Sequence, residues 1–305
     1  MDERKNLPTK LATQSLAATT EKHGSLVGRG LAAVQIGHQS GLSRNQEVGT
    51  AEEQYRLGLK YDSGDGVAQD YVEAARWYRK AADQGHASAQ YNLGQMCRAG
   101  EGVTIDYEAA VNWYRLAADQ SHVQAQFTLG SMYDDGNGVP QDYKEAVKWF
   151  RLAADQSDVD AQFCLAYMYQ HGQGVLQDYE DAAKWFRLAA DQGDAAAQFQ
   201  LGFMYYSGRG VSNNYEDAAK WFRLAADQGH AAAQCQLGFL YFSGQGVPKD
   251  REKAEQWTRL AADQGDAHAQ SNLKTMLPKG ESLQARLEAL GVGKGWTLKI
   301  TMPPQ

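Results

Sequence analysis

Hydrophobic and polar positions recur along this chain with a fixed period of 36 residues. The period is marked by tryptophan, which stands at Trp77, Trp113, Trp149, Trp185, Trp221 and Trp257. The segment Ala-Ala-Asp-Gln and the loop Gly-x-Gly-Val return at the same interval. Six full units cover residues 51–266, and a seventh begins at Ala267 and loses the pattern after Leu273. A fixed period of this length is typical of repeat proteins, in which neighbouring units share one core.

The first half of each unit predicts a helix. In the fifth unit, Gln198, Leu201, Gly202 and Tyr205 follow the spacing i, i+3, i+4, i+7, which places these four residues on one helical face. The paired glycines of the loop then end this helix, because glycine adopts the backbone angles that a sharp reversal requires.

A second helix is predicted after the loop. It begins next to Asn214 in the fifth unit, where the other units have aspartate, and a short polar side chain at this place caps the free N–H groups of the first turn. Glu216 and Lys220 are spaced to pair on the outer surface. The stripe expected to be buried consists of Ala218, Trp221, Phe222 and Ala225.

A small residue recurs inside the first helix, at Gly58, Gly94, Gly130, Ala166, Gly202 and Gly238. Glycine inside a helix costs about 1 kcal/mol relative to alanine, so a compensating contact is expected. We predict that the second helix approaches closely at this slot and that the tryptophan of the unit fills the space beside it.

The consensus A-x-x-Q-x-x-L-G-x-x-Y-x-x-G-x-G-V-x-x-D-Y-x-x-A-x-x-W-x-x-x-A-A-x-Q-G resembles the Sel1-like repeat, a relative of the tetratricopeptide repeat. The resemblance implies an all-α fold, a right-handed α/α superhelical solenoid whose concave surface is lined by the first helices. It also implies adaptor roles in signalling, quality control, envelope biogenesis and bacterial host interaction. We expect no change of fold from the departures, which are Cys97, Ser121, Ser157, Asn214 and Arg251.

Three segments are expected. Residues 1–50 are rich in Gly, Ser, Thr and Gln and are predicted to be a low-order segment. Residues 279–305 contain an amphipathic stretch, 281–290, expected to form a helix that caps the stack, followed by a strand-like run, 296–300, without an evident partner. Between them lies the solenoid, 51–278, with repeats at 51–86, 87–122, 123–158, 159–194, 195–230 and 231–266 and a partial repeat at 267–278.

Charge and composition narrow the classes of partner and compartment. The formal net charge is −7, whereas a nucleic-acid-binding protein normally shows a basic patch, so nucleic acid is not an expected partner. No apolar run reaches the roughly 18 residues of a membrane-spanning helix. Cys97, Cys164 and Cys235 lie in alternate units, where stacking separates them, so we expect free thiols. A cytoplasmic monomer is predicted, and secretion through a signal of unrecognised form within residues 1–50 stays open.

The sequence contains no constellation that predicts catalysis, a cofactor or a metal. The Gly-x-Gly loops follow helices, whereas a dinucleotide-binding loop follows a strand. The histidines at unit ends, His86, His122 and His230, lack ligand spacing and are interpreted as turn residues. Asp134 and Asp135 lack the alternating order of a calcium loop and are interpreted as solvated. The protein is therefore expected not to be an enzyme.

Three functions are compared. The favoured one is a scaffold or adaptor that binds a partner protein or peptide in the concave groove, because a solenoid exposes an extended surface without needing catalytic groups. A secreted or envelope-associated bacterial host-interaction factor would use the same groove. An enzyme would need groups from the C-terminal segment, where Lys294, Trp296 and Lys299 cluster.

The candidate binding residues come from two positions of the first helix of each unit: the ninth, which faces outward, and the twelfth, which flanks the outward face. In the first three units these positions carry mostly polar residues: Leu59, Asp62, Gln95, Arg98, Ser131 and Asp134. In the later units they carry Gln170 and five aromatic residues: Tyr167, Phe203, Tyr206, Phe239 and Phe242. We predict that these five rings anchor the partner, because aromatic side chains dominate binding energy at interfaces. The competing interpretation is that they pack against the neighbouring first helix.

Overall fold

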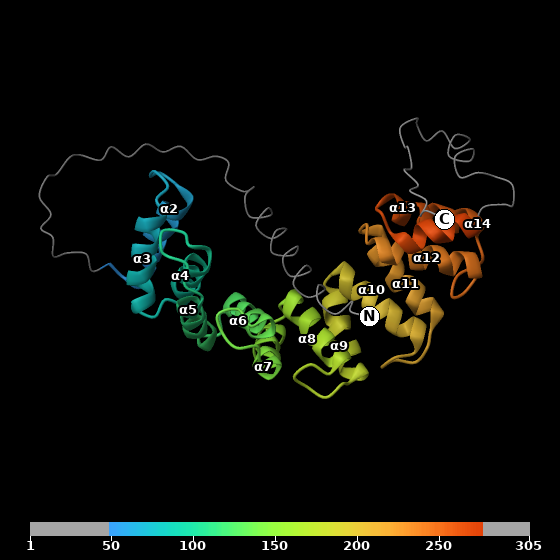
Figure 1. Ribbon diagram of the computed structural model, residues 1–305, viewed down its shortest axis with the longest axis horizontal. Helices are drawn as coiled ribbons and strands as arrows, with labels where there is room; N and C mark the ends of the chain where they lie inside the picture. The colour runs from blue at the N-terminus through green and yellow to red at the C-terminus, as the bar shows by residue number, and fades with distance from the viewer. Residues whose placement is uncertain (1–48, 277–305) are drawn as a thin grey trace, which may run out of the picture. The chain divides into compact units, whose positions relative to one another are not determined.

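The structure, a computed structural model, describes residues 49–276, and all regular elements in that range are α-helices (Figure 1). The helices are α2 (Ala51–Ser63), α3 (Tyr71–Asp83), α4 (Ala87–Ala99), α5 (Tyr107–Asp119), α6 (Val123–Asp135), α7 (Tyr143–Ala154), α8 (Val159–His171), α9 (Tyr179–Asp191), α10 (Ala195–Ser207), α11 (Tyr215–Asp227), α12 (Ala231–Ser243), α13 (Arg251–Asp263) and α14 (Ala267–Met276). The predicted helix–turn–helix repeat of 36 residues is therefore confirmed.

The chain divides into two compact units, residues 1–192 and 193–305. The first contains α2–α9 and the second α10–α14. Within each unit, the second helix of a repeat packs against its own first helix and against the first helix of the next repeat. The expectations for residues 1–48, for the capping helix 281–290 and for the run 296–300 lie outside the described residues.

Polar side chains begin the second helices as predicted. The carboxylate of Asp70 accepts hydrogen bonds from the backbone N–H groups of Val72 and Glu73, and Asn214 caps α11 in the same way. These contacts satisfy donors that the first turn of a helix leaves free. The expected pair between Glu216 and Lys220 is wrong: Lys220 Nζ lies 2.8 Å from Oδ1 of Asp217, one residue further along.

The histidines at the ends of the repeats cap the first helix of the following repeat, a role that the sequence interpretation missed. Nδ1 of His86 accepts from the backbone N–H of Ala89, and the ring stacks on Tyr55 with the centroids 4.4 Å apart. His122 and His230 do the same for α6 and α12. Burial lowers the pKa of both histidines, so the neutral ring that accepts a hydrogen bond is favoured.

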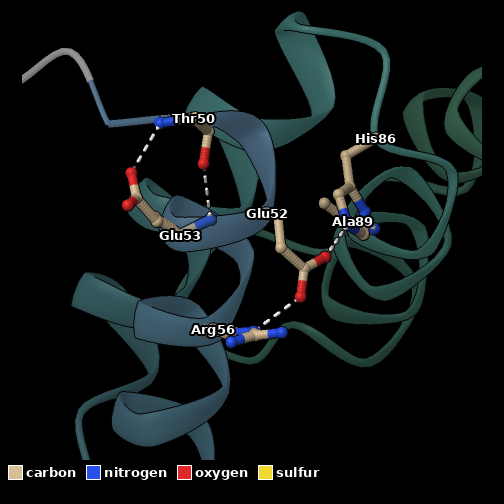
Figure 2. A network of polar contacts seen from close by, with 6 residues as sticks. All are labelled: Thr50, Glu52, Glu53, Arg56, His86 and Ala89. Carbon is tan, nitrogen blue, oxygen red and sulfur yellow. Dashed lines mark hydrogen bonds and ion pairs between the residues drawn. The ribbon is translucent and has the colours of Figure 1, made fainter.

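Two groups of polar contacts stabilise the beginning of the first repeat (Figure 2). Thr50 and Glu53 form a reciprocal capping box at the N-terminus of α2. The Glu52 carboxylate lies between His86 and Arg56, and hydrogen bonds with these two side chains lower its pKa. Because Nδ1 of His86 accepts from Ala89, its Nε2 carries the proton and donates to Glu52 over 3.0 Å.

The small slot of the first helix lies against a ring, as the predicted close approach requires. A Cβ atom on Gly202 would lie 2.8 Å from Cδ1 of Phe222, a fully buried side chain. The prediction that tryptophan fills this space is wrong, because the next residue does so and Trp221 is only half-buried. In the fourth repeat, where Ala166 occupies the slot, the rings of Phe163 and Phe186 meet at an interplanar angle of 63°. The corresponding ring pairs of repeats one, two, three and five have interplanar angles of 35–47°.

In four of the repeats, the second glycine of the loop lies against the repeat before it: Gly102, Gly138, Gly174 and Gly246. A Cβ atom on Gly138 would lie 2.7 Å from the Cβ of Tyr107, at the start of the preceding second helix. Gly246 lies against the backbone of Tyr215 so closely that a Cβ atom would overlap the Tyr215 carbonyl. In the first repeat, Gly66 has no such neighbour. Stacking therefore requires glycine here for its size as well as for its positive φ.

A glutamine side chain of each repeat lies inside the core, with 3–5% of its surface exposed: Gln54, Gln90, Gln126, Gln162, Gln198 and Gln234. Gln120 donates to Oε1 of Gln90 over 2.7 Å, and Nε2 of Gln90 donates over 3.1 Å to the carbonyl of Ala82 in the preceding repeat. The same two bonds recur at Gln126, Gln162 and Gln234. We call this arrangement the glutamine ladder, and it links each of these repeats to its predecessor.

We predict that Gly246→Ala destabilises the second unit more than Gly229→Ala does. Both glycines have positive φ, 67° and 89°, so alanine is strained by about 1–2 kcal/mol at either site. Gly229 has open space around its Cα, whereas a side chain at Gly246 must displace the Tyr215 backbone, which adds about 1–3 kcal/mol. Urea titration of both variants measures the difference, and equal losses would contradict the role of Gly246 in stacking.

Gln234→Leu is expected to lower the free energy of unfolding by about 2–4 kcal/mol, because it leaves the Gln264 amide and the Ala226 carbonyl without their buried partner. The matched control is Gln270→Leu at the same repeat position in α14, where the side chain is exposed and its single bond to Ala262 is 3.3 Å long. That change should cost less than about 0.5 kcal/mol. Thermal melts of both variants check the ranking, and a control as damaging as Gln234→Leu would contradict it.

Candidate functional site

The five predicted binding residues fall into both units. Tyr167 lies on α8 in the first unit, half-buried, with its ring stacked on His171 at a centroid distance of 4.0 Å. Burial and the charge of Asp134 raise the pKa of Tyr167. Tyr167 therefore has polar neighbours on the inner helices of its own unit.

Asp134, at the end of α6, is a partly buried carboxylate. Burial, with the negative charge of Asp135 beside it, raises the pKa of Asp134 to about 6. The expectation of a fully solvated acid pair is therefore wrong for Asp134, whose side chain is half-buried. Carboxylates so placed destabilise the folded state while they are ionised.

The other four predicted residues lie in the second unit, and we call Phe203, Tyr206, Phe239 and Phe242 the aromatic surface. Phe203 and Tyr206 on α10 are half-buried and pack against the core of the unit, and Tyr206 meets Tyr215 edge-on at 5.4 Å. Phe239 and Phe242 on α12 are each 37% exposed. The two α10 rings are thus partly covered by their own unit, whereas each α12 ring leaves more than a third of its surface open to solvent.

Two first helices of the second unit, α10 and α12, contain no Asp, Glu, Lys or Arg residue, whereas α2 has three acidic and two basic residues in the same length. Lys249 lies at the edge of the aromatic surface, with its Nζ 6.0 Å from the centre of the Phe242 ring. The aromatic surface is therefore suited to apolar, uncharged groups.

The first unit has a shallow depression of about 450 Å³, lined by residues that include Arg115, Glu145, Lys148 and Trp149. Three of its charged groups contact one another or a neighbour: Lys148 pairs with Glu145 over 3.3 Å, and Arg115 donates to the Tyr133 hydroxyl over 2.6 Å. Sequence reasoning did not identify this depression.

Among residues 49–276, no three His, Cys, Asp or Glu side chains gather as metal ligands, and no helix is long and apolar enough to cross a membrane. The three thiols are free, as predicted. Burial raises the pKa of all three thiols, that of Cys235 to about 11. Such thiols stay protonated near neutral pH and are poor nucleophiles.

The family profile described as Sel1 repeat matches the chain at residues 54–86, 87–122, 123–158, 159–194, 195–230 and 231–266. The chain belongs to the Sel1 repeat family. These matches confirm the resemblance found in the sequence, and they span all six repeats. Among curated proteins, none matches the chain.

Two solved structures share this Sel1 repeat architecture. One is a protective antigen present in uropathogenic Escherichia coli strains, displaying an SLR fold, with 39% identity and a TM-score of 0.73; the match covers 80% of this chain and 54% of the antigen. The other is a Sel1 repeat protein from Oxalobacter formigenes, with 38% identity, a TM-score of 0.63 and coverage of 75% and 66%. The chain thus spans about half the length of the antigen.

We predict that Asp134→Asn stabilises the first unit at pH 8. The folded-state pKa of about 6 lies above the ordinary 3.8, so ionised Asp134 opposes folding above pH 6, and this penalty disappears as the pH falls through 6 towards 4. The gain at pH 8 should be about 1–2 kcal/mol after allowance for solvent screening of the half-buried group, and should vanish near pH 4. Urea titrations at both pH values test this, and a gain independent of pH would contradict the assignment.

Proposed function

We propose that this Sel1 repeat protein is a non-catalytic scaffold that binds a partner protein or peptide through the inner surface of its repeats, with the aromatic surface of the second unit as the main anchor. The observation that carries the proposal is the pair of exposed phenylalanines, Phe239 and Phe242, on a helix without charged residues. Exposed aromatic side chains in a charge-free patch tend to mark interaction sites, since their burial drives association.

Tyr167 is proposed as a separate, secondary contact in the first unit. Its half-buried ring stacks on His171, so only part of its surface is available to a partner. The acidic neighbour Asp134 makes this place suitable for a polar or basic part of the partner rather than an apolar one.

A second candidate role uses the same surface. The similar Escherichia coli protein is a protective antigen of uropathogenic strains, which supports a secreted or envelope-associated host-interaction factor. This role differs from that of an adaptor in the compartment where the partner is bound. The binding surface is the same. Fractionation of the native host cells, with detection in cytoplasm, envelope and medium, separates the two.

The scaffold proposal predicts that Phe239→Ser with Phe242→Ser weakens partner capture about 30- to 700-fold, because each lost aromatic anchor removes about 1–2 kcal/mol of binding free energy. The partner is first identified by affinity capture with the unchanged chain and mass spectrometry, and its affinity is then measured by titration. Both side chains are partly exposed, so the melting temperature should change little.

The matched control is Leu224→Ser with Leu260→Ser. These leucines are 47% and 48% exposed, so they remove comparable apolar area from the second helices of the same unit. The control should bind the partner as the unchanged chain does. A folded Phe239→Ser, Phe242→Ser variant that binds with full affinity would show that the partner uses another surface.

A further inference from the structure

The run at residues 296–300, Trp-Thr-Leu-Lys-Ile, has an apolar face that the sequence leaves without a partner. Trp296, Leu298 and Ile300 alternate with Thr297 and Lys299, so an extended chain presents the three apolar side chains on one side. Residues 291–305 contain two lysines and no acidic residue. The apolar face of such a segment is better accommodated by an apolar surface than by water.

The aromatic surface of the second unit has the complementary properties. Its helices α10 and α12 have no charged side chain, and its two most open rings, Phe239 and Phe242, are each 37% exposed. Aromatic-lined surfaces of this kind bind extended segments whose alternate side chains enter between the rings.

The chain leaves the described structure in the same unit as this surface. Met276, the last residue of α14, is 5% exposed and belongs to the same core cluster of the second unit against which Phe203 and Tyr206 pack. The intervening residues, 277–295, reach at most about 60–70 Å when extended and about 45 Å if ten of them are helical. A helix of 13 residues such as α12 is about 20 Å long, so the tether is long enough to reach any part of the surface.

We propose that residues 296–300 occupy the aromatic surface of their own chain, so that a partner must displace them in order to bind. This inference rests on the proposed function of that surface. A tether of this length gives the segment an effective concentration on the order of millimolar. With a dissociation constant of about 100 µM for the free segment, the surface is about tenfold less available to an outside ligand than in a chain whose segment cannot bind.

The test uses the full chain and a fluorescent synthetic peptide with the sequence of residues 291–305. A variant with Trp296→Ser, Leu298→Ser and Ile300→Ser should bind the peptide about tenfold more tightly than the unchanged chain, as measured by anisotropy. The control Thr297→Ser with Thr301→Ser changes the other side of the segment and should behave as the unchanged chain. A peptide carrying the three apolar-to-serine changes should fail to compete.

The surface itself is tested by adding Phe239→Ser and Phe242→Ser to the triple variant, which should remove peptide binding while the far-UV spectrum keeps its helical form. Equal peptide affinity of the unchanged chain and the triple variant, absence of binding to either, or binding that survives the phenylalanine changes would each overturn the proposal. Those results leave partner capture by the aromatic surface intact, whereas capture that survives Phe239→Ser and Phe242→Ser overturns the proposed function alone.

Discussion

The stacking of repeats within each unit depends on the hydrogen bonds that the buried glutamine side chains of the glutamine ladder make. An amide inside an apolar core has two donors and an acceptor, and leaving them unpaired costs more than the core gains from the space they fill. Gln90 meets this requirement only when its own repeat supplies Gln120 and the preceding repeat supplies the Ala82 carbonyl. The bonds are directional, so they fix the register of one repeat on the next, which apolar packing between alanine-rich helices leaves loosely defined.

The other contacts between repeats follow from the same spacing. The second loop glycine, such as Gly138, admits the backbone of the preceding repeat, and the small slot admits a ring of its own repeat. On the outer helices, Arg79 stacks on Trp113 at 5.1 Å and Arg223 on Trp257 at 5.2 Å, which covers the half-buried tryptophans with flat cationic groups. The interfaces between repeats one and two and between repeats five and six therefore each combine a buried glutamine hydrogen bond, a close backbone contact and a tryptophan covered by arginine.

The positions that contact a neighbouring repeat are constrained by packing, whereas the outward positions of the first helices can differ between repeats. In the first unit these positions carry mostly polar residues. One of them is Asp134, although its partial burial destabilises the ionised carboxylate. In the second unit they hold aromatic rings on helices without charge. The solenoid thus presents different chemistry on the same scaffold, and its buried, protonated thiols add no reactive group to it. Specificity in such a protein lies in side chains that the repeat pattern does not constrain.

The sequence by itself determined the helices, their order and the family, because periodicity, capping residues and loop glycines act through local chain geometry that every repeat shares. It also located the positions at which rings gather. Only the tertiary structure decided that Phe222 rather than Trp221 fills the slot, since neighbouring residues share an apolar stripe and the approach angle of the other helix selects between them. The same holds for the capping role of His86, the raised pKa of Asp134, and the different exposure of Tyr206 and Phe239. Burial and hydrogen bonding are set by groups distant in the chain, and a repeat consensus contains no information about how far each side chain is covered by its neighbours.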